Sequence, residues 1–356
     1  MNDYDLWFTT INTSNRNKLN LIRQFKNTRE ICYRFANEKK YDKKFCYDRD
    51  RINAIKEEMI KEGIKVVFYY DEDYPKILKN YDDTAFGLFY KGNIKKINSI
   101  STNVGIVGSR NCTRYGFNIT KTLVKDLVKQ GIGIISGMAR GIDSYAHTEC
   151  LENNGYTCAI LGCGANVIYP RENKELYCKI VDKGCIISQY EPNTKPMPYN
   201  FPVRNRIISG LSDVIVVVEA GIKSGSLITA GAALDQGKEV AAVPGSVFSK
   251  TSLGTNMLIK EGAHPVTSSS DIFDILGLQV KNNSDYNSAE KIKFEKSEEK
   301  NIYNLITDIP MHVDDIRRLA NIDIKELYAL LFEMQLKNEI LCLSGNYYVR
   351  MNNAFK

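Results

Sequence analysis

Positively charged and small polar residues recur in this sequence directly after short apolar runs. The run VGIV ends in Gly108, Ser109 and Arg110, and Gly-rich or charged segments follow five later apolar runs. Arginine binds phosphate through a forked pair of hydrogen bonds, and serine hydroxyls and glycine-exposed backbone amides add further donors. An aromatic ring beside them, as at Phe201 in NFPVRN, lets a nucleobase stack, which contributes about 1–3 kcal/mol per base. These residue types predict a site for a nucleotide or for single-stranded nucleic acid.

The apolar runs alternate with helical patterns from residue 103 onward. This order is typical of a parallel sheet that is covered by helices on both faces. We therefore expect an α/β fold, with a doubly wound Rossmann-like parallel sheet over residues 100–278. Ligands of such sheets bind at the carboxyl ends of the strands, which is where every Gly-rich segment falls. The expected strands are 104–107, 131–136, 157–162, 185–190, 213–220 and 239–245, with 265–269 as a candidate seventh; the expected helices are 114–130, 141–154, 171–183, 201–211, 224–237 and 254–262.

The rest of the chain predicts smaller parts. Residues 1–62 place apolar residues at helical spacing between charges, which indicates an N-terminal helical domain of the SAM-like type. Residues 63–278 form the extended Rossmann-like domain, with further strand candidates at IKVVFYY and GLFYKGN. Residues 279–297 are polar and repeat-free, as a linker is. Residues 298–356 give helix, short helix, long helix and hairpin, an order that predicts a C-terminal winged-helix domain.

The composition narrows the class of protein. The net charge of the 356 residues is +6, and residues 15–62 carry 14 Lys/Arg against 8 Asp/Glu. This basic segment fits an anionic partner and solvated helical faces equally well. The apolar runs are far shorter than the roughly 20 residues of a membrane span, and the start MNDYDLWFTT is unlike a signal peptide. We expect a cytoplasmic protein that makes no membrane contact, and the scattered cysteines and histidines imply no metal or cofactor.

The residues that an enzyme would need are sparse. Glu219 and Asp213 fall near the same edge of the sheet, but they form no carboxylate pair at a defined spacing. A dinucleotide site is a weak match, because GCG at 162–164 lacks the third glycine of GxGxxG. One enzymatic alternative stays open, a nucleotide-processing hydrolase resembling the lysine-decarboxylase-like phosphoribohydrolases. Its phosphate loop matches poorly, because PGS at 244–246 is separated from GT at 254–255.

The segments that follow the strands resemble those of a known family. Seven blocks occur in one order over about 160 residues: GSRNCTRYG, SGMARGIDSYAH, AILGCGANVIYPREN, NFPVRNRIISGLSD, EAGIKSGSLITAGAALDQGKEV, PGS and GTNMLIKEGA. Together they resemble the DprA/Smf family of bacterial DNA-processing proteins, and NFPVRNRIISGLSD is the most specific of them. The resemblance extends more weakly to YPKILKN, LFYKGN and the C-terminal segment, and it fades over the first 60 residues.

The resemblance implies a protein that is not an enzyme and that binds single-stranded DNA. Members of the family form homodimers, coat DNA strands that enter the cell during transformation, and help to load a RecA-type recombinase for homologous recombination. Carried onto this sequence, Ser109 and Arg110 would hold phosphate, Phe201 would stack on or wedge against a base, and Arg204 and Asn205 would contact backbone or base edges. The implied DNA-binding set is Gly108, Ser109, Arg110, Asn200, Phe201, Arg204, Asn205, Lys223 and Asn256.

Several of these side chains also have ordinary structural explanations. Phe201 precedes a proline at the start of a helix, where core packing is common. Arg206 suits an ion pair with Glu219 as well as it suits a phosphate contact. For Asp143 we favour a structural role, as a helix cap or as the partner of Arg140.

Two further expectations complete the interpretation. His147 lies in a helical pattern and is expected to be a packed structural histidine. The long helix of the winged-helix segment begins DIKE, and acidic residues there oppose phosphate, so we favour a protein-contact or regulatory role for it over DNA reading. The DNA hypothesis depends on Arg110 and fails if that side chain is sealed in the interior or faces away from Phe201.

Overall fold

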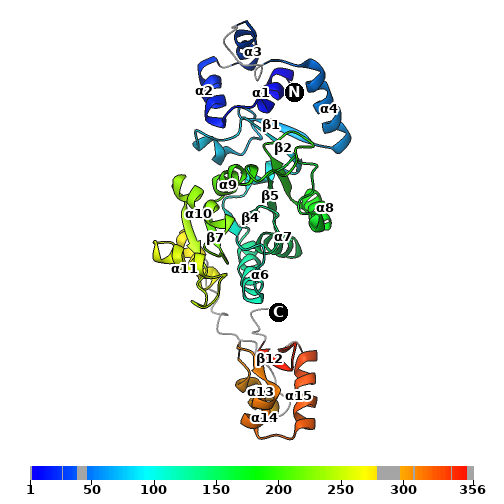
Figure 1. Cartoon of the computed structure of the whole chain (residues 1–356), viewed down its shortest axis with the longest axis vertical. Helices are drawn as coiled ribbons and strands as arrows, with labels where there is room; N and C mark the ends of the chain where they lie inside the picture. The colour runs from blue at the N-terminus through cyan, green and yellow to red at the C-terminus, as the bar shows by residue number, and fades with distance from the viewer. Residues whose placement is uncertain are drawn as a thin grey trace. The chain divides into compact units, whose positions relative to one another are not determined.

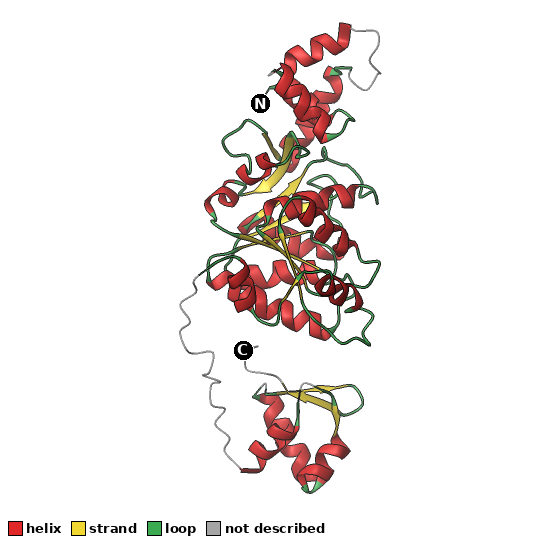
Figure 2. Cartoon of the chain, turned by 90° about the vertical axis from the view of Figure 1, so that its left-hand side faces the viewer, coloured by secondary structure: helices red, strands yellow, loops and turns green. Residues whose placement is uncertain are grey.

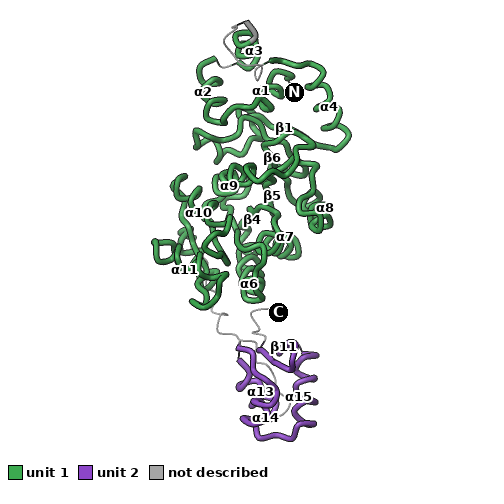
Figure 3. Tube along the Cα trace, viewed as in Figure 1, with its two compact units in different colours: residues 1–279 green, residues 280–356 purple. Residues whose placement is uncertain are grey.

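The computed structural model describes residues 2–25, 27–37, 46–278, 297–307, 309–337 and 339–350 (Figure 1, Figure 2). The chain divides into two compact units, residues 1–279 and residues 280–356 (Figure 3). Of the predicted linker, only Ser297 belongs to the described residues.

A nine-stranded sheet forms the centre of the first unit. Its strands are β1 (Lys65–Phe68), β2 (Gly87–Gly92), β3 (Asn103–Val107), β4 (Gly133–Ser136), β5 (Thr157–Leu161), β6 (Cys185–Ser188), β7 (Val214–Val217), β8 (Glu239–Ala242) and β9 (His264–Pro265). They lie in the order β1-β2-β6-β5-β4-β3-β7-β8-β9. In this spatial order, all strands from β6 through β5, β4, β3, β7 and β8 to β9 pair in parallel. β1 and β2 extend the β6 edge by antiparallel pairing. The predicted doubly wound sheet is confirmed, and its order reverses between β3 and β7.

Helices cover both faces of this sheet (Figure 1, Figure 2). One face carries α6 (Arg114–Lys129), α7 (Ile142–Glu152) and α8 (Lys174–Lys183); the other carries α9 (Asn200–Leu211), α10 (Gly225–Asp235) and α11 (Leu253–Lys260). The strands are buried on both sides, so their central residues, such as Ile106 and Ile215, are fully inaccessible to water. Each predicted strand and helix of the main sheet is confirmed to within a few residues, except that the candidate strand 265–269 is only the two-residue β9. Shorter elements complete the unit: η2 (Lys76–Asn80), α5 (Lys95–Ser99), η3 (Arg171–Asn173) and α12 (Ser269–Ile275).

The N-terminal residues are helical, as predicted. They form α1 (Asp3–Thr10), α2 (Asn15–Phe25), α3 (Thr28–Asn37) and α4 (Arg49–Glu62). These helices share one hydrophobic core with the antiparallel edge of the sheet, where the rings of Phe8 and Phe86 meet edge-on with centroids 4.9 Å apart. The helical segment therefore packs directly on the sheet, and a division at residue 62 remains our proposal.

The second unit has the predicted winged-helix order. Its helices are α13 (Ser297–Leu305), α14 (Val313–Ala320) and α15 (Ile324–Leu336), and its strands are β10 (Met311–His312), β11 (Ile340–Leu343) and β12 (Tyr347–Arg350). The strands form a small antiparallel sheet in the order β10-β12-β11, of which the sequence predicted the hairpin β11–β12 but not β10. Ile302, Ile316 and Leu331, one from each helix, are fully buried in its core.

Candidate nucleic-acid interface

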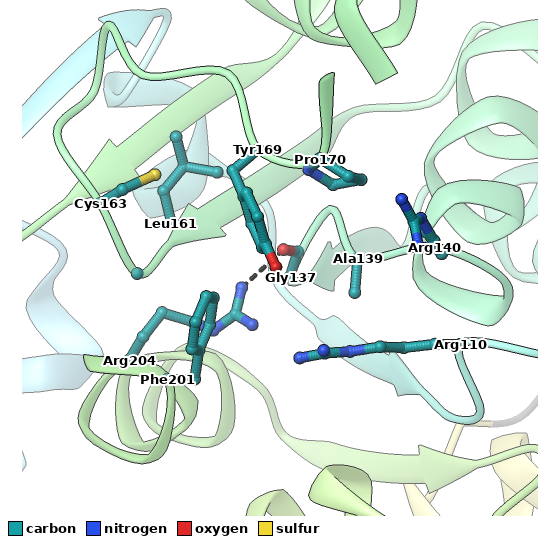
Figure 4. A pocket seen from close by; sticks show the side chains of 11 residues that line it. Arg110, Gly137, Ala139, Arg140, Leu161, Cys163, Tyr169, Pro170, Phe201 and Arg204 are labelled. Atoms are coloured by element: carbon teal, nitrogen blue, oxygen red, sulfur yellow. Dashed lines mark hydrogen bonds between the residues drawn. The ribbon is translucent and has the colours of Figure 1, made fainter. Parts of the chain in front are cut away.

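The turns that follow β3, β4 and β5 enclose an open depression at the carboxyl edge of the sheet (Figure 4). Its empty volume is about 450 Å³. Arg110 enters it from the first turn, Gly137 and Arg140 from the second, and Gly162 from the third, while α9 supplies its floor. The depression lies at the edge where the glycine-rich segments were predicted to gather.

Phe201, the second residue of α9, lies close to two guanidinium groups. The Cζ atoms of Arg110 and Arg204 are each 5.7 Å from the centroid of its ring. A cation within about 6 Å of an aromatic centroid is attracted by the electron density of the ring face. The ring of Tyr169 lies 5.7 Å from that of Phe201, centroid to centroid, with 40° between the planes. The result is an aromatic pair bordered by positive charge, with Phe201 half-buried and Tyr169 41% exposed.

Arg110 is exposed, and its guanidinium group reaches across the depression toward Phe201 (Figure 4). Within the described part of the chain, Arg110 forms no ion pair, whereas the neighbouring Arg140 pairs with Glu172. The geometric condition set from the sequence is therefore met. An unpaired guanidinium group keeps all of its donors available for a phosphate.

The turn that carries Arg110 is fixed by its neighbours. Ile142 donates its backbone N–H to the carbonyl oxygen of Ser109 at 3.2 Å, and the Ser109 hydroxyl oxygen accepts from the N–H of Asn111 at 3.2 Å. A Cβ on Gly108 would lie 2.7 Å from Cγ1 of Ile142, so the close packing of α7 on this turn requires glycine. Gly108 and Ser109 thus shape the turn, and its exposed charge belongs to Arg110.

Two other glycines make room for the floor of the depression. A Cβ on Gly162 would lie 2.9 Å from Cδ1 of Phe201, and one on Gly137 would lie 2.4 Å from Nη1 of Arg204. Both distances are shorter than a normal van der Waals contact between these atoms, so the neighbouring side chain would have to move. The tips of β4 and β5 therefore need glycine because the side chains of α9 press against their backbone.

Arg204 differs from Arg110 because it is buried. Its Nη1 donates to the carbonyl oxygens of Gly137, at 2.6 Å, and Ile160, and its Nε donates to Oδ1 of Asn205 at 3.2 Å. Burial lowers the pKa of this guanidinium group, and the charge of Asp143 opposes that shift. Arg204 supports Phe201 from within the protein, and it lines the depression without being freely exposed.

Asp143 is the buried counterpart of this arginine. Its carboxylate accepts from the backbone N–H groups of Gly137, at 3.1 Å, and Ala139, at 3.4 Å. Burial raises its pKa, and the charge of Arg204 partly offsets the increase. The role of Asp143 is structural, as expected, but it takes neither expected form. Asp143 lies in the first turn of α7 and binds the preceding segment without capping the helix, and Arg140 pairs with Glu172.

The three asparagines of the predicted set bond to the backbone of the protein. Nδ2 of Asn200 donates to the carbonyl oxygen of Gly162 at 3.0 Å, and Nδ2 of Asn205 donates to that of Gly225 at 3.3 Å. Asn256 makes a pair of bonds to Gly245, accepting from its N–H at 3.2 Å and donating to its oxygen at 2.9 Å. These amides hold the loops in place, which sequence reasoning did not anticipate.

The structure brings part of the predicted set into one pocket. Arg110, Phe201 and Arg204 line the depression together, whereas the exposed Lys223 lies on the segment after β7 and the half-buried Asn256 lies in α11. Tyr169 was missed by the sequence reasoning. Its signal was present in the block AILGCGANVIYPREN, where an aromatic residue follows the glycine-rich turn.

Two other expectations concerned charged residues near this edge. Of the two alternatives for Arg206, the ion pair with Glu219 is wrong, because Arg206 binds Asp83 at 2.7 Å and Asp235 at 3.2 Å. Both carboxylates come from segments remote from the motif, so they could not be predicted from it. His147 is confirmed as a packed histidine: it is fully buried, its Nδ1 lies 2.6 Å from the hydroxyl oxygen of Thr157, and burial lowers its pKa to about 3.

Glu219, the candidate acid of the enzymatic alternative, is 1% exposed. Its carboxylate accepts from the N–H of Thr113 at 2.8 Å, from the Thr113 hydroxyl at 2.6 Å and from the Thr251 hydroxyl at 3.1 Å. It ties the segment after β3 to the segment after β8. This carboxylate is therefore buried, and it does not line the depression.

Neither metal ligands nor membrane spans were found where the structure can be described. Among those residues, no group of three or more His, Cys, Asp or Glu side chains is placed to hold a metal ion. In the same ranges, no helix combines the length and the apolar character needed to cross a membrane.

Comparison with known proteins identifies relatives over most of the chain. The DNA processing protein DprA of Bacillus subtilis is 42% identical over 216 residues, which are 61% of this chain and 72% of that protein. Protein Smf of Escherichia coli is 36% identical over 293 residues, 80% of this chain and 76% of its own. The crystal structure of DprA from Streptococcus pneumoniae matches with a TM-score of 0.66 and 33% identity, over 77% of this chain and 98% of that one.

A second solved relative is DprA from Helicobacter pylori, whose structure is described as giving insight into a single-stranded DNA binding mode. It matches with a TM-score of 0.54 and 30% identity, over 60% of this chain and 95% of that one. The family described as DNA recombination-mediator protein A matches residues 65–277, and the DprA winged helix domain matches residues 291–346. The glycine-lined depression falls within the first match, and the second match covers the described winged-helix elements up to β11; the chain belongs to the DprA family of DNA recombination-mediator proteins.

Proposed function

We propose that this protein binds single-stranded DNA in the depression at the carboxyl edge of its sheet and catalyses no reaction there. The observation that carries the proposal is the exposed, unpaired Arg110 facing the half-buried ring of Phe201. The guanidinium group binds a phosphate, while Phe201 and Tyr169 receive an unpaired base. The relatives support this assignment, since they are DNA-processing proteins and one of them has a described single-stranded DNA binding mode.

The geometry favours single strands over duplex DNA for a physical reason. In a duplex the faces of each base are stacked on its neighbours, so no face is free for Phe201. A single strand exposes these faces, and stacking on a protein ring tolerates any base. The full proposed set remains that of the sequence analysis, with Arg110, Phe201 and Lys223 as direct contacts and Arg204, Asn200, Asn205 and Asn256 as supports of the loops.

The proposal extends to the cellular role. We infer that the protein forms a homodimer, protects incoming strands during transformation and helps to load a RecA-type recombinase, because the resemblance of its motifs implies these properties. A cytoplasmic location stays a prediction. The hydrolase alternative is less well supported, because its candidate acid, Glu219, is buried and its carboxylate accepts three hydrogen bonds from the protein.

Fluorescence anisotropy with a labelled 20-mer of thymidine tests the binding proposal. We expect tighter binding of the single strand than of the same length of duplex, and a log–log salt dependence with a slope of about 0.7 per phosphate neutralised. Arg110→Ala removes a charged hydrogen-bond donor, a loss of about 1.5–3 kcal/mol, or roughly 10-fold to 150-fold in Kd.

The matched control is Lys129→Ala. Lys129 is exposed and ends α6, the helix that begins beside the Arg110 turn, so its removal deletes one positive charge at the far end of the same helix. Equal affinity for single and double strands, or equal losses in the two variants, would contradict the proposal.

A further inference from the structure

Phe248, in the loop between β8 and α11, keeps 95% of its surface exposed, and the adjacent Val247 keeps 70%. Isolated apolar residues on a surface are ordinary. This ring differs because the backbone of the loop beneath it is held in place, so that the protein presents an aromatic side chain to solvent from a fixed point.

Hydrogen bonds fix both ends of this loop. Gly245 is held by the two bonds to Asn256, and at the other end the carbonyl oxygen of Thr251 accepts from the N–H of Ala220 at 2.7 Å. Within the loop, Ser249 donates its N–H to the carbonyl oxygen of Ser246 at 3.0 Å, which closes a turn around Phe248. Because this backbone is already ordered, a ligand that covers the ring has only the rotation of the side chain left to restrict.

The loop lies on the same edge of the sheet as the depression. β8 pairs with β7, and β7 pairs with β3, the strand that precedes the turn carrying Arg110. Strands lie about 4.8 Å apart, so the ends of β3 and β8 are separated by roughly 10 Å. The hydroxyl of Tyr115 donates to the carbonyl oxygen of Pro244 at 2.8 Å and thereby links the start of α6 to this loop.

Two cations accompany Phe248. Lys250 lies in the same loop, and Lys223 lies in the segment after β7; both are exposed, and neither forms an ion pair within the described residues. The two segments touch, since a Cβ on Gly221 would lie 3.3 Å from the carbonyl oxygen of Lys250. Unpaired cations on these two touching segments, together with an exposed ring at the edge that carries Arg110, match what a nucleic-acid strand requires.

We propose that Phe248 is a second stacking platform for single-stranded nucleic acid, and that Lys223 and Lys250 bind the phosphates that approach it. This inference rests on the proposed function, because the same strand would run from Phe201 past Arg110 to Phe248. The strand occupies the whole carboxyl edge from β5 to β8, and a base beyond the first pocket stacks on the Phe248 ring.

A Phe248→Trp variant gives a direct readout. The chain contains one tryptophan, Trp7, and it is 3% exposed, so the new indole supplies the ligand-sensitive fluorescence. A titration with unlabelled oligothymidines of 3 to 20 nucleotides should quench this emission once the oligomer is long enough to span both rings, while the wild-type protein stays unquenched. Emission that is unchanged by every oligomer overturns the inference.

Affinities provide the second test. Phe248→Ala should raise the Kd of the 20-mer roughly 5-fold or more and leave the Kd of the 3-mer unchanged, since one base stack is lost. Val247→Ala is the matched control, because it shortens an exposed neighbour that has no ring and should change neither value. Both residues are exposed, so neither substitution disturbs the fold.

Arg110→Ala separates this inference from the proposed function. If Arg110→Ala weakens binding and Phe248→Ala does not, the second platform is refuted and the first site stands. If neither variant changes binding, the proposed function fails as well. A Phe248→Ala protein that binds DNA normally but sediments as a smaller species overturns the inference in favour of a protein contact.

Discussion

Replacing Gly162 by alanine adds a single methyl group beneath the ring of Phe201. The new Cβ would lie 2.9 Å from Cδ1 and 3.1 Å from Cε1 of that ring. Non-bonded carbon atoms prefer separations of about 3.5–4.0 Å, so the ring must retreat by about 0.6 Å or more. Gly162 does not have a positive φ angle, so its backbone accepts alanine and the whole effect comes from this contact.

The displacement acts on the place where we propose that a base stacks. Complete loss of a stack is worth about 1–3 kcal/mol, and a displaced ring loses part of it, so we expect the Kd for a thymidine 20-mer to rise roughly 5-fold. Phe201→Ala removes the ring altogether and sets the upper limit. Overpacking of cores costs about 1–3 kcal/mol of stability, and we expect the low end here because Phe201 is only half-buried.

Anisotropy titrations and urea denaturation of the same samples separate the two effects. Gly231→Ala is the matched control, because no atom lies within 4 Å of its added Cβ and the residue is inside α10. Alanine is the better helix former by about 1 kcal/mol, so this control should be more stable and bind DNA normally. If Gly162→Ala and Phe201→Ala both bind the 20-mer as tightly as the wild type, the assignment of Phe201 to a base is refuted.

Three further outcomes follow from buried and paired charges. Burial lowers the pKa of His147 to about 3, while the unfolded chain titrates near 6.5, so below pH 6.5 the unfolded state binds a proton that the folded state refuses. Stability should therefore fall by up to about 1.4 kcal/mol per pH unit as the pH drops from 6.5 toward 3, and urea denaturation of His147→Gln should lack this slope. Glu219→Gln turns an amide toward hydrogen-bond donors, so the free energy of unfolding should fall by about 1–3 kcal/mol in the same assay. When either this variant or the wild type is incubated with nucleoside monophosphates, chromatography should detect no released base. Arg206→Ala breaks two partly exposed ion pairs, so we expect a stability loss near 1 kcal/mol by thermal denaturation and an unchanged DNA Kd.

The strands and helices of the sheet were predictable because their pattern is local. A run such as VIVVV has no polar residue to place in water, so a strand buried on both faces is its natural state. The glycine-rich segments could be assigned to the strand ends because they directly follow the apolar runs, which is also a local pattern. Arg110 was predictable as an exposed charge because it directly follows such a run, and the structure places it at that edge.

The partners of the other charges were not predictable, because they come from segments distant in sequence. Arg206 binds Asp83 and Asp235, which lie 123 residues before it and 29 residues after it. The amides of Asn200 and Asn256 bond to backbone atoms of loops that only the folded sheet brings near. A motif shows which residue types gather at a site, but the choice between binding a ligand and bonding to the protein is made by tertiary contacts.

The two arginines beside Phe201 illustrate this choice. Arg204 is buried, and a buried charge is costly unless hydrogen bonds satisfy it. Here the carbonyl oxygens of Gly137 and Ile160 accept from one of its nitrogens, and the amide oxygen of Asn205 accepts from another, so its plane is fixed against the ring. Arg110, on the same ring at the same 5.7 Å, has no such partners and remains exposed. The buried arginine therefore keeps the ring in position before any ligand arrives, and this arrangement leaves the exposed arginine free to bind a phosphate.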